Sequence, residues 1–148
     1  MKKFADVILP LPLYSYFTYS LPDEWVDEVQ TGCRVVVPFG RKKYYTAIVQ
    51  NIHYSAPAGY EVKEVSALLD AHPILLPEQF RFWDWLADYY LCTRGDVYKA
   101  ALPSGLKLES ETIVEYNPDF ESDVQLPEKE QKILDLLAAE PEQCITKL

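Results

Sequence analysis

A short basic segment offers the clearest chemistry in this sequence. Arg41, Lys42 and Lys43 directly follow Gly40, so three cationic side chains stand at one turn. β-Prone residues flank the turn on both sides, which predicts a hairpin over residues 33–52. Because glycine can adopt a positive φ and lets a ligand approach closely, the tip is a candidate contact surface. The alternative is an ordinary hairpin whose lysines keep an exposed strand edge soluble.

No set of residues has the spacing of a catalytic or metal site. Cys33, Cys92 and Cys144 lie far apart without a C-x-x-C pair, and His53 and His72 stand alone. The sequence holds no nucleophile elbow, no recognisable carboxylate pair and no G-x-x-x-x-G-K-[ST] phosphate loop. We therefore expect a binding module rather than an enzyme, with no metal site, in a reducing compartment.

The charge is unevenly distributed. The whole chain of 148 residues has a formal net charge of −9. Residues 1–110 hold 11 Lys and Arg against 13 Asp and Glu, net −2, whereas residues 111–148 hold 3 against 10, net −7. The global acidity therefore does not exclude an anionic ligand for the first part of the chain.

The apolar N-terminal stretch is not typical of a signal peptide, because Asp6, Pro10 and Pro12 interrupt it. No run of apolar residues is long enough to span a membrane. We expect no membrane partner and a cytoplasmic location.

The elements that must position the basic turn are mostly strands. Alternation and turn residues predict strands at 4–9, 16–21, 34–37, 44–52 and 62–69. In the second of these, Phe17 and Tyr19 share one face. Five short strands with one buried face predict a mainly β fold with helices, as a small curved sheet or OB-like open barrel.

The clearest helix is predicted over residues 77–91, with Pro77 in its first turn. One apolar stripe contains Phe80, Trp83, Ala87 and Tyr90. Further apolar residues widen this stripe: Phe82, Trp85, Leu86 and Tyr89. We therefore expect the helix to pack on more than one side, as core rather than as an aromatic ligand platform.

The remaining chain predicts two smaller parts. Asp96 is expected to cap a short helix that ends near Leu102. A strand at 112–116, a polar linker at 117–125 and a helix at 127–140 follow. The apolar stripe of that last helix needs a partner, and few residues remain. We expect a chain cut inside a second domain; the alternative is that the helix folds back on the first.

Several motifs in a fixed order carry a family resemblance. They are L-P-L-P, F-T-Y-S-L-P, G-C-R-V-V-V-P-F-G-R, E-V-K-E-V, A-D-Y-Y, G-D-V and A-L-P-S-G-L. In this order they resemble the N-terminal DNA-binding domain of the PriA replication-restart helicases, also called primosomal protein N′, over residues 4–108. The following stretch is similar to the start of the family's winged-helix domain. The resemblance implies a 3′-DNA-end-binding domain at 1–110, a linker at 111–125 and a truncated winged-helix domain at 126–148.

The resemblance also implies a function and a site. The family domain recognises the 3′ end of the nascent leading strand at stalled or abandoned replication forks. Carried over by motif position, its pocket residues are Phe17, Thr18, Gly40 and Lys63, with possible DNA backbone contacts from Arg41, Lys42 and Lys43. Thr18 stands where the family usually has aspartate, and Ala47 where it more often has glycine.

The resemblance implies further partners for the full-length family: branched forks with a free 3′ end, other primosome proteins and single-stranded-DNA-binding protein. It also implies an ATP-dependent 3′-5′ helicase with Mg²⁺ and structural zinc, in a nucleoid-associated, cytoplasmic setting. The helicase lobes and zinc-binding cysteines are absent here, so we expect no cofactor in this chain.

The residues alone leave two other classes open. A small aromatic barrel with L-P-L-P and exposed tyrosines could be a peptide-binding or docking module. It could also be an accessory domain that shapes the substrate cleft of an enzyme.

Overall fold

The computed structural model describes residues 2–59, 61–108, 113–115, 117, 127–139 and 142–144. The chain forms two compact units, Met1–Glu109 and Ser110–Leu148. None of the helices in the described ranges is long and apolar enough to cross a bilayer.

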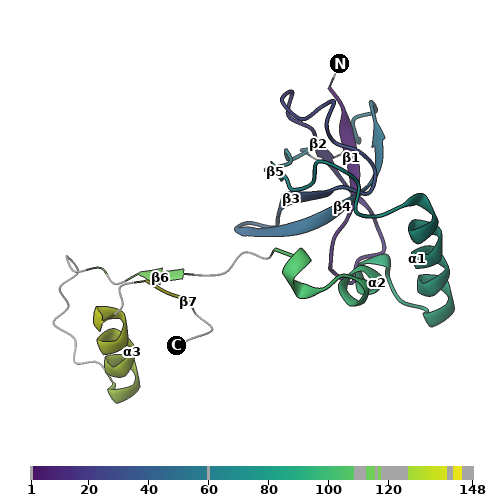
Figure 1. Ribbon diagram of the computed structural model, residues 1–148. Helices are drawn as coiled ribbons and strands as arrows, with labels where there is room; N and C mark the ends of the chain where they lie inside the picture. Colours follow the sequence, from purple (N-terminus) through teal and green to yellow (C-terminus); the bar gives the residue numbers. More distant parts are fainter. Residues whose placement is uncertain are drawn as a thin grey trace. The chain divides into compact units, whose positions relative to one another are not determined.

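Within its described residues, the first unit contains an antiparallel five-stranded sheet in the order β2-β1-β4-β3-β5 (Figure 1). Its strands are β1 (Phe4–Ile8), β2 (Phe17–Ser20), β3 (Arg34–Phe39), β4 (Lys43–His53) and β5 (Ala67–Leu68). The predicted mainly β fold class with helices is therefore confirmed.

The segment that leads into β5 joins the two edges of this sheet. The Ser20 amide on β2 donates to the Lys63 carbonyl at 2.9 Å, and the Val65 amide donates to the Ser20 carbonyl at 3.0 Å. β5 then pairs with β3 at Val35 and Val36. The sheet thus closes as a small barrel, which leaves less strand edge exposed. The strand predicted over 62–69 is wrong in extent, because only a bridge at Glu64 and the two residues of β5 have strand geometry.

The predicted hairpin is present as β3 and β4, with Gly40 at φ 69° in the turn. β4 is longer than its neighbour β1, which pairs with it only over Ile48–His53. The part of β4 near the hairpin tip therefore extends past β1. There the Leu108 carbonyl accepts hydrogen bonds from the Thr46 amide at 3.1 Å and from the Thr46 hydroxyl at 2.8 Å.

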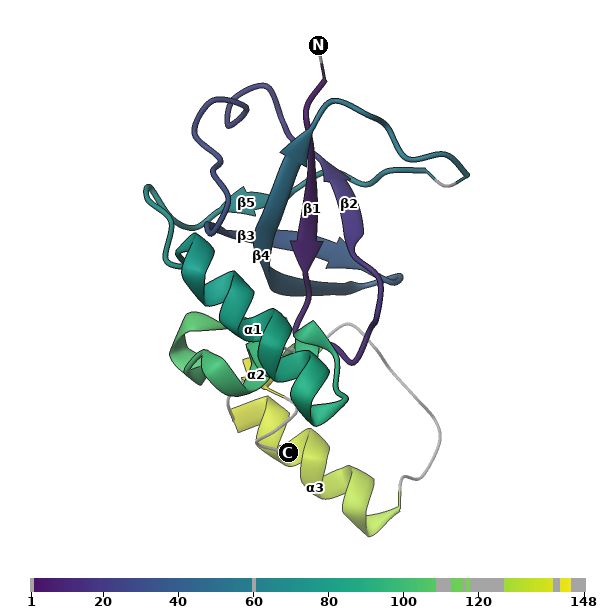
Figure 2. The same ribbon diagram turned by 90° about the vertical axis from the view of Figure 1, so that its right-hand side faces the viewer.

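Two apolar clusters form the core. The first lies inside the barrel and includes Val7, Tyr19, Val35 and Val49, which are all buried. The second lies where helices α1 (Pro77–Tyr90) and α2 (Arg94–Ala101) meet the outer side of β1 and β4. Both views place the two helices side by side at one end of the barrel (Figures 1 and 2).

Tyr98 joins α2 to the barrel. Its ring stacks on Trp83 of α1 with centroids 5.8 Å apart, and its hydroxyl donates to the Thr46 carbonyl on β4 at 2.9 Å. The side chain is fully buried, so its polar end has a hydrogen-bond partner where water cannot reach.

The cap of α2 differs from the prediction. Thr93, not Asp96, is the N-cap: its hydroxyl accepts from the Asp96 amide at 3.1 Å. Asp96 is the third helical residue and accepts from the Thr93 amide at 3.0 Å. The Asp96 carboxylate also accepts from the Thr93 hydroxyl at 2.7 Å, and this bond, followed by the one from the Thr93 amide, holds the pKa of Asp96 below its usual range. The two residues therefore form a capping box: each side chain accepts a hydrogen bond from the backbone amide of the other residue.

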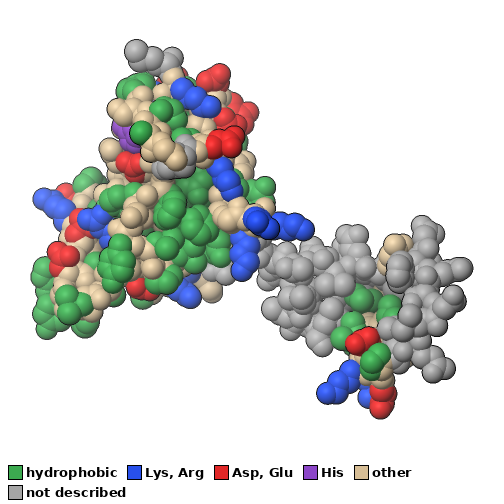
Figure 3. Space-filling model, turned by 180° about the vertical axis from the view of Figure 1, so that it is seen from behind, with side chains coloured by type: hydrophobic (Ala, Val, Ile, Leu, Met, Phe, Trp, Pro, Cys, Tyr) green, Lys and Arg blue, Asp and Glu red, His purple; other side chains and the backbone are tan. Residues whose placement is uncertain are grey.

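The prediction that α1 packs on more than one side is wrong. Phe82, Trp85 and Tyr89 are more than half exposed, at 55%, 55% and 65%. Their rings stack in a row, with centroids 5.9 Å apart for Phe82 and Trp85 and 5.2 Å apart for Trp85 and Tyr89. Hydrophobic side chains accordingly cover much of the outer surface of this helix (Figure 3).

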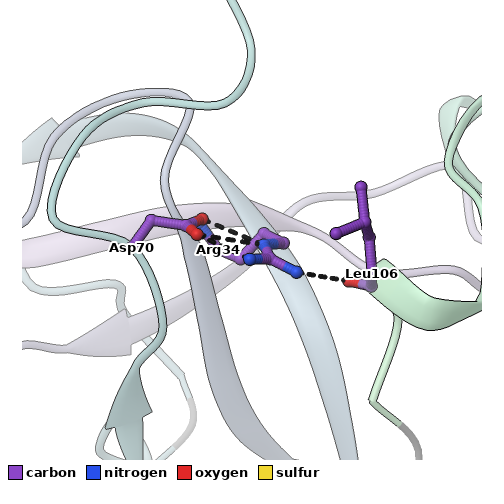
Figure 4. A network of polar contacts seen from close by, with 3 residues as sticks. All are labelled: Arg34, Asp70 and Leu106. Atoms are coloured by element: carbon purple, nitrogen blue, oxygen red, sulfur yellow. Dashed lines mark hydrogen bonds and ion pairs between the residues drawn. The ribbon is translucent and has the colours of Figure 1, made fainter.

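An ion pair fastens the chain entering α1 to the start of β3 (Figure 4). The Arg34 guanidinium donates to both carboxylate oxygens of Asp70, at 2.6 Å from Nη2 and 3.0 Å from Nε, and its Nη1 donates to the Leu106 carbonyl at 2.9 Å. Burial alone would raise the pKa of Asp70, but the hydrogen bonds and charge of Arg34 hold it below its usual value. The same bonds raise the pKa of Arg34. A short 3-10 helix, Ser104–Leu106, carries the accepting carbonyl.

In its described residues the second unit contains α3 (Glu128–Ala139) and an antiparallel pair, β6 (Ile113–Glu115) with β7 (Glu142–Cys144). The strand predicted at 112–116 corresponds to β6, whereas β7 was not predicted. Leu137 is the buried member of the apolar stripe of α3. Of the predicted linker, residues 118–125 lie outside the described residues. The proposed domain limits at 110 and 125 stay predictions.

Candidate nucleic-acid interface

A pocket of about 170 Å³ lies between β2, the β3–β4 turn and the segment that closes the barrel. It is lined by Phe17, Thr18, Tyr19, Pro38, Phe39, Gly40, Glu61 and Lys63. The four predicted pocket residues, which are up to 46 positions apart in sequence, therefore line one hollow.

One wall of the pocket is apolar. Phe17 packs edge-on against Phe39 with ring centroids 5.0 Å apart, and both rings are partly buried against the barrel core. The Tyr19 hydroxyl donates to the Pro38 carbonyl at 3.1 Å, which fixes the end of β3 against β2. Such a fixed aromatic wall can contact the face or edge of a base.

The opposite wall carries a cation. The Lys63 ammonium donates to the Gly40 carbonyl at 2.7 Å, so it lies beside the turn. It retains two further N–H donors for an anionic group. A Cβ added to Gly40 would meet no atom within 4 Å, so the space in front of this glycine is open.

The third side is the outer edge of β2. Because Ser20 directs its amide and carbonyl toward Lys63 and Val65, Thr18, two residues earlier, directs its own backbone groups to the same edge. Those groups lie beside the pocket and can bond a ligand through the main chain.

The structure adds a carboxylate that the sequence interpretation missed. Asp6 on β1 lies directly opposite Thr18 on β2. The Thr18 hydroxyl donates to Asp6 Oδ1 at 2.7 Å, and His53 Nε2 lies 3.2 Å from the same oxygen. Strand alternation could have placed Asp6 on the polar face of β1, but only the register between the strands pairs it with Thr18.

Two charged features flank the pocket. The predicted backbone-contact residues Arg41, Lys42 and Lys43 are exposed at the tip of the hairpin, directly after Gly40, where Figure 3 shows Lys and Arg side chains together. Glu61, an exposed residue, also lines the pocket. Basic side chains therefore lie next to the pocket, and the pocket lining itself carries one cation, Lys63, and one carboxylate, Glu61.

A larger hollow of about 500 Å³ lies between the residues before β2 and the ends of α1 and α2. Arg94 forms an ion pair there with Asp84 and lies 4.8 Å above the Tyr16 ring centroid. Burial, then the neighbouring Asp88, raises the pKa of Asp84. None of the predicted site residues lines this hollow. Within it the Arg94 guanidinium is paired with Asp84.

The described residues hold no group of three or more His, Cys, Asp or Glu that could bind a metal. Burial raises the pKa of the Cys33 thiol, which is the behaviour of an unreactive core cysteine.

Fold and pocket together define a small-barrel binding domain whose site combines an aromatic wall, an open glycine turn and an ammonium group. Comparison with known proteins makes this more specific. A family model described as the 3′DNA-binding domain (3′BD) of PriA matches residues 6–103, and a winged helix domain model matches residues 111–148. The chain belongs to the PriA 3′DNA-binding domain family. The resemblance carried by its motifs is therefore confirmed.

Individual relatives agree with this assignment. The replication restart protein PriA of Bacillus subtilis is 33% identical over 136 residues, which is 88% of this chain and 17% of the relative. The protein of the same name in Haemophilus influenzae is 35% identical over 108 residues, 71% of this chain and 14% of the relative. The chain thus matches less than a fifth of the length of these relatives.

Proposed function

We propose that this chain binds DNA by holding the terminal nucleotide of a free 3′ end, and that it does so for a replication restart protein. The observation that carries the proposal is the pocket itself, in which Phe17, Thr18, Gly40 and Lys63 line one hollow beside a basic hairpin tip. An end-binding pocket needs a surface for the base, close backbone approach, an acceptor for the hydroxyl and a cation for the phosphate. Each of these has a residue here.

The charge of the domain is compatible with this mode of binding. A protein that follows a long phosphate track needs a basic stripe, whereas a pocket for one nucleotide needs only one or two cations. Lys63 serves the terminal phosphate, and Arg41, Lys42 and Lys43 serve phosphates farther along the strand. A domain with a net charge of −2 over residues 1–110 can therefore bind DNA at its end.

In a replication setting the ligand is the 3′ end of the nascent leading strand at a stalled or abandoned fork. Binding there would position the rest of a restart protein, with primosome proteins and single-stranded-DNA-binding protein as partners, in the nucleoid-associated cytoplasm. We assign helicase activity, ATP with Mg²⁺ and structural zinc to other parts of such a protein, because this chain has no phosphate loop.

The test is a binding comparison at fixed salt. A fluorescent single strand with a free 3′-hydroxyl should bind more tightly than the same strand with a 3′-phosphate, and a labelled strand offering only a 5′ end, its 3′ end blocked in a hairpin, should bind weakly. Equal binding of all three would contradict end recognition. It would then favour the hairpin tip at Arg41 to Lys43 as a non-specific DNA contact.

A further inference from the structure

The contact between Asp6 and Thr18 determines how the Thr18 hydroxyl can meet a ligand. A threonine hydroxyl has one proton to donate and two lone pairs that accept. Here the proton points to Asp6 Oδ1 at 2.7 Å, a distance typical of a hydrogen bond to a carboxylate. What remains on the oxygen is acceptor capacity.

The strands hold this arrangement in place. Asp6 and Thr18 occupy directly opposing positions of an antiparallel pair. The backbone groups of Thr18 point away from β1, so the two residues form a non-hydrogen-bonded pair, whose side chains lie closest together. His53, from β4 on the other side of β1, lies 3.2 Å from the same carboxylate oxygen and limits its rotation.

We propose that Asp6 is a specificity-determining residue of the 3′-end pocket: it holds the Thr18 hydroxyl as an obligate acceptor for the terminal 3′-hydroxyl. This rests on the proposed end-binding function and adds the basis of its selectivity. A ligand hydroxyl can donate to Thr18, whereas a 3′-phosphate presents oxygens to an acceptor and places negative charge near Asp6. Asp6 acts through Thr18 and is therefore a positioning residue.

The experiment uses the 148-residue chain and three fluorescent single strands of one sequence, ending in 3′-hydroxyl, 3′-hydrogen or 3′-phosphate. The wild type should prefer the 3′-hydroxyl to the 3′-hydrogen strand. Asp6→Asn should reduce this preference by up to about tenfold, the size of one net hydrogen bond between neutral groups. Its affinity for the 3′-hydrogen strand should stay within about twofold of the wild type, because that strand offers no proton to Thr18.

Three further variants complete the design. Thr18→Val removes the hydroxyl at constant shape and should lose the same preference. Asp6→Asn combined with Thr18→Asp returns a carboxylate to the pocket wall and should restore the preference. Asp23→Asn removes an exposed carboxylate that does not line the pocket and should change nothing. If Asp6→Asn does not fold, Asp6→Thr keeps a strand-forming residue and carries the same test.

The outcomes separate the two proposals. A wild type that binds the 3′-hydroxyl, 3′-hydrogen and 3′-phosphate strands equally contradicts the end-binding function. A wild type that rejects the 3′-phosphate strand but binds the 3′-hydroxyl and 3′-hydrogen strands equally overturns only the acceptor role of Thr18, and with it that of Asp6. A wild type with a clear preference that survives in Asp6→Asn or in Thr18→Val overturns the role of Asp6 alone. The contact between the two strands would then only satisfy polar groups on the sheet surface.

Discussion

Lys63 is the cation of the pocket, and its contact with Gly40 leaves two donors for a phosphate. Lys63→Met keeps the apolar stem and removes the charge. We expect it to weaken binding of every 3′ sequence equally and to lower the slope of log K against log salt by about 0.7 for a single strand. Fluorescence titrations at several salt concentrations measure this, with Lys2→Met, a change at an exposed lysine outside the pocket, as control. A sequence-dependent loss would show that Lys63 contacts a base instead.

Gly40 allows a second test at the level of a single residue. Its φ of 69° is unfavourable for a residue with a Cβ, although an added Cβ would meet no neighbouring atom. Gly40→Ala should therefore cost about 1–2 kcal/mol of folding stability through backbone strain alone. It should also weaken binding of 3′ ends, since the methyl group takes up part of the open space in front of this glycine.

Gly105→Ala is the matched control for Gly40→Ala, because Gly105 also has open space around it but lacks the positive φ. Urea unfolding and end-binding titrations of the two variants separate strain from obstruction. If Gly40→Ala binds 3′ ends like the wild type, the turn is not part of the pocket mouth.

The sequence predicted the pocket residues that recognisable motifs contain, and it missed those that only the fold brings near. Gly40 has a local signature, since a glycine between Phe39 and three basic residues indicates a turn. Asp6 has no such signature, because its role depends on the register of β1 against β2. Glu61 lines the pocket because the segment after residue 60 closes the barrel. This contact joins residues far apart in the chain, so the local spacing of residue types does not predict it.

At the scale of one element, α1 carries two tryptophans in opposite environments. Trp83 is 5% exposed and stacks on Tyr98, whereas Trp85 is 55% exposed in the outer aromatic row. Trp83→Ala should cost about 3–5 kcal/mol of stability by opening a cavity. Trp85→Ala should cost less than about 1 kcal/mol, because it removes ring contacts at the surface. Thermal and urea unfolding check the pair, and equal losses would mean that the outer row of α1 is buried in solution.

The same helix shows what the spacing of apolar residues can and cannot predict about burial. Apolar residues at the spacing of a helix predicted its length to within one residue. Of the predicted stripe, Phe80, Trp83 and Ala87 are buried, whereas Tyr90 is 68% exposed, so that member is wrong. The outer row has the composition of a second core face, but none of the described residues of the first unit buries it. Composition alone cannot distinguish a face buried within the domain from one exposed on its surface.

The ion pair that fastens the start of β3 predicts a pH dependence of stability. The pKa of Asp70 is lower in the folded protein than in the unfolded chain, so the unfolded chain binds more protons in the acid range. The stabilisation by Asp70 is therefore complete above the unfolded pKa of about 3.9 and is lost as the pH falls through the folded pKa.

Asp70→Asn should remove about 3 kcal/mol at neutral pH, because it leaves the Arg34 guanidinium, which is 15% exposed, without its counter-charge. It should also flatten the loss of stability at acid pH. Urea unfolding between pH 7 and pH 3 measures both effects. Asp27→Asn is the control, since Asp27 forms an ion pair with Lys3 but is 91% exposed. An equally steep acid loss in Asp70→Asn would assign the pH dependence to other carboxylates.

At the scale of the whole molecule, the contacts of residues 106–108 decide where the first unit ends. The Leu106 carbonyl accepts from Arg34, and the Leu108 carbonyl accepts twice from Thr46. A polypeptide of residues 1–109 keeps all three hydrogen bonds, and we expect it to retain the melting temperature of its domain and the 3′-end affinity of the 148-residue chain. A polypeptide of residues 1–103 loses them and should be less stable by about 3 kcal/mol, near 1 kcal/mol for each bond. Calorimetry and end-binding titrations of both polypeptides test this: an unstable 1–109 polypeptide, or one that no longer binds 3′ ends, would show that residues 110–148 contribute to the fold or to the site.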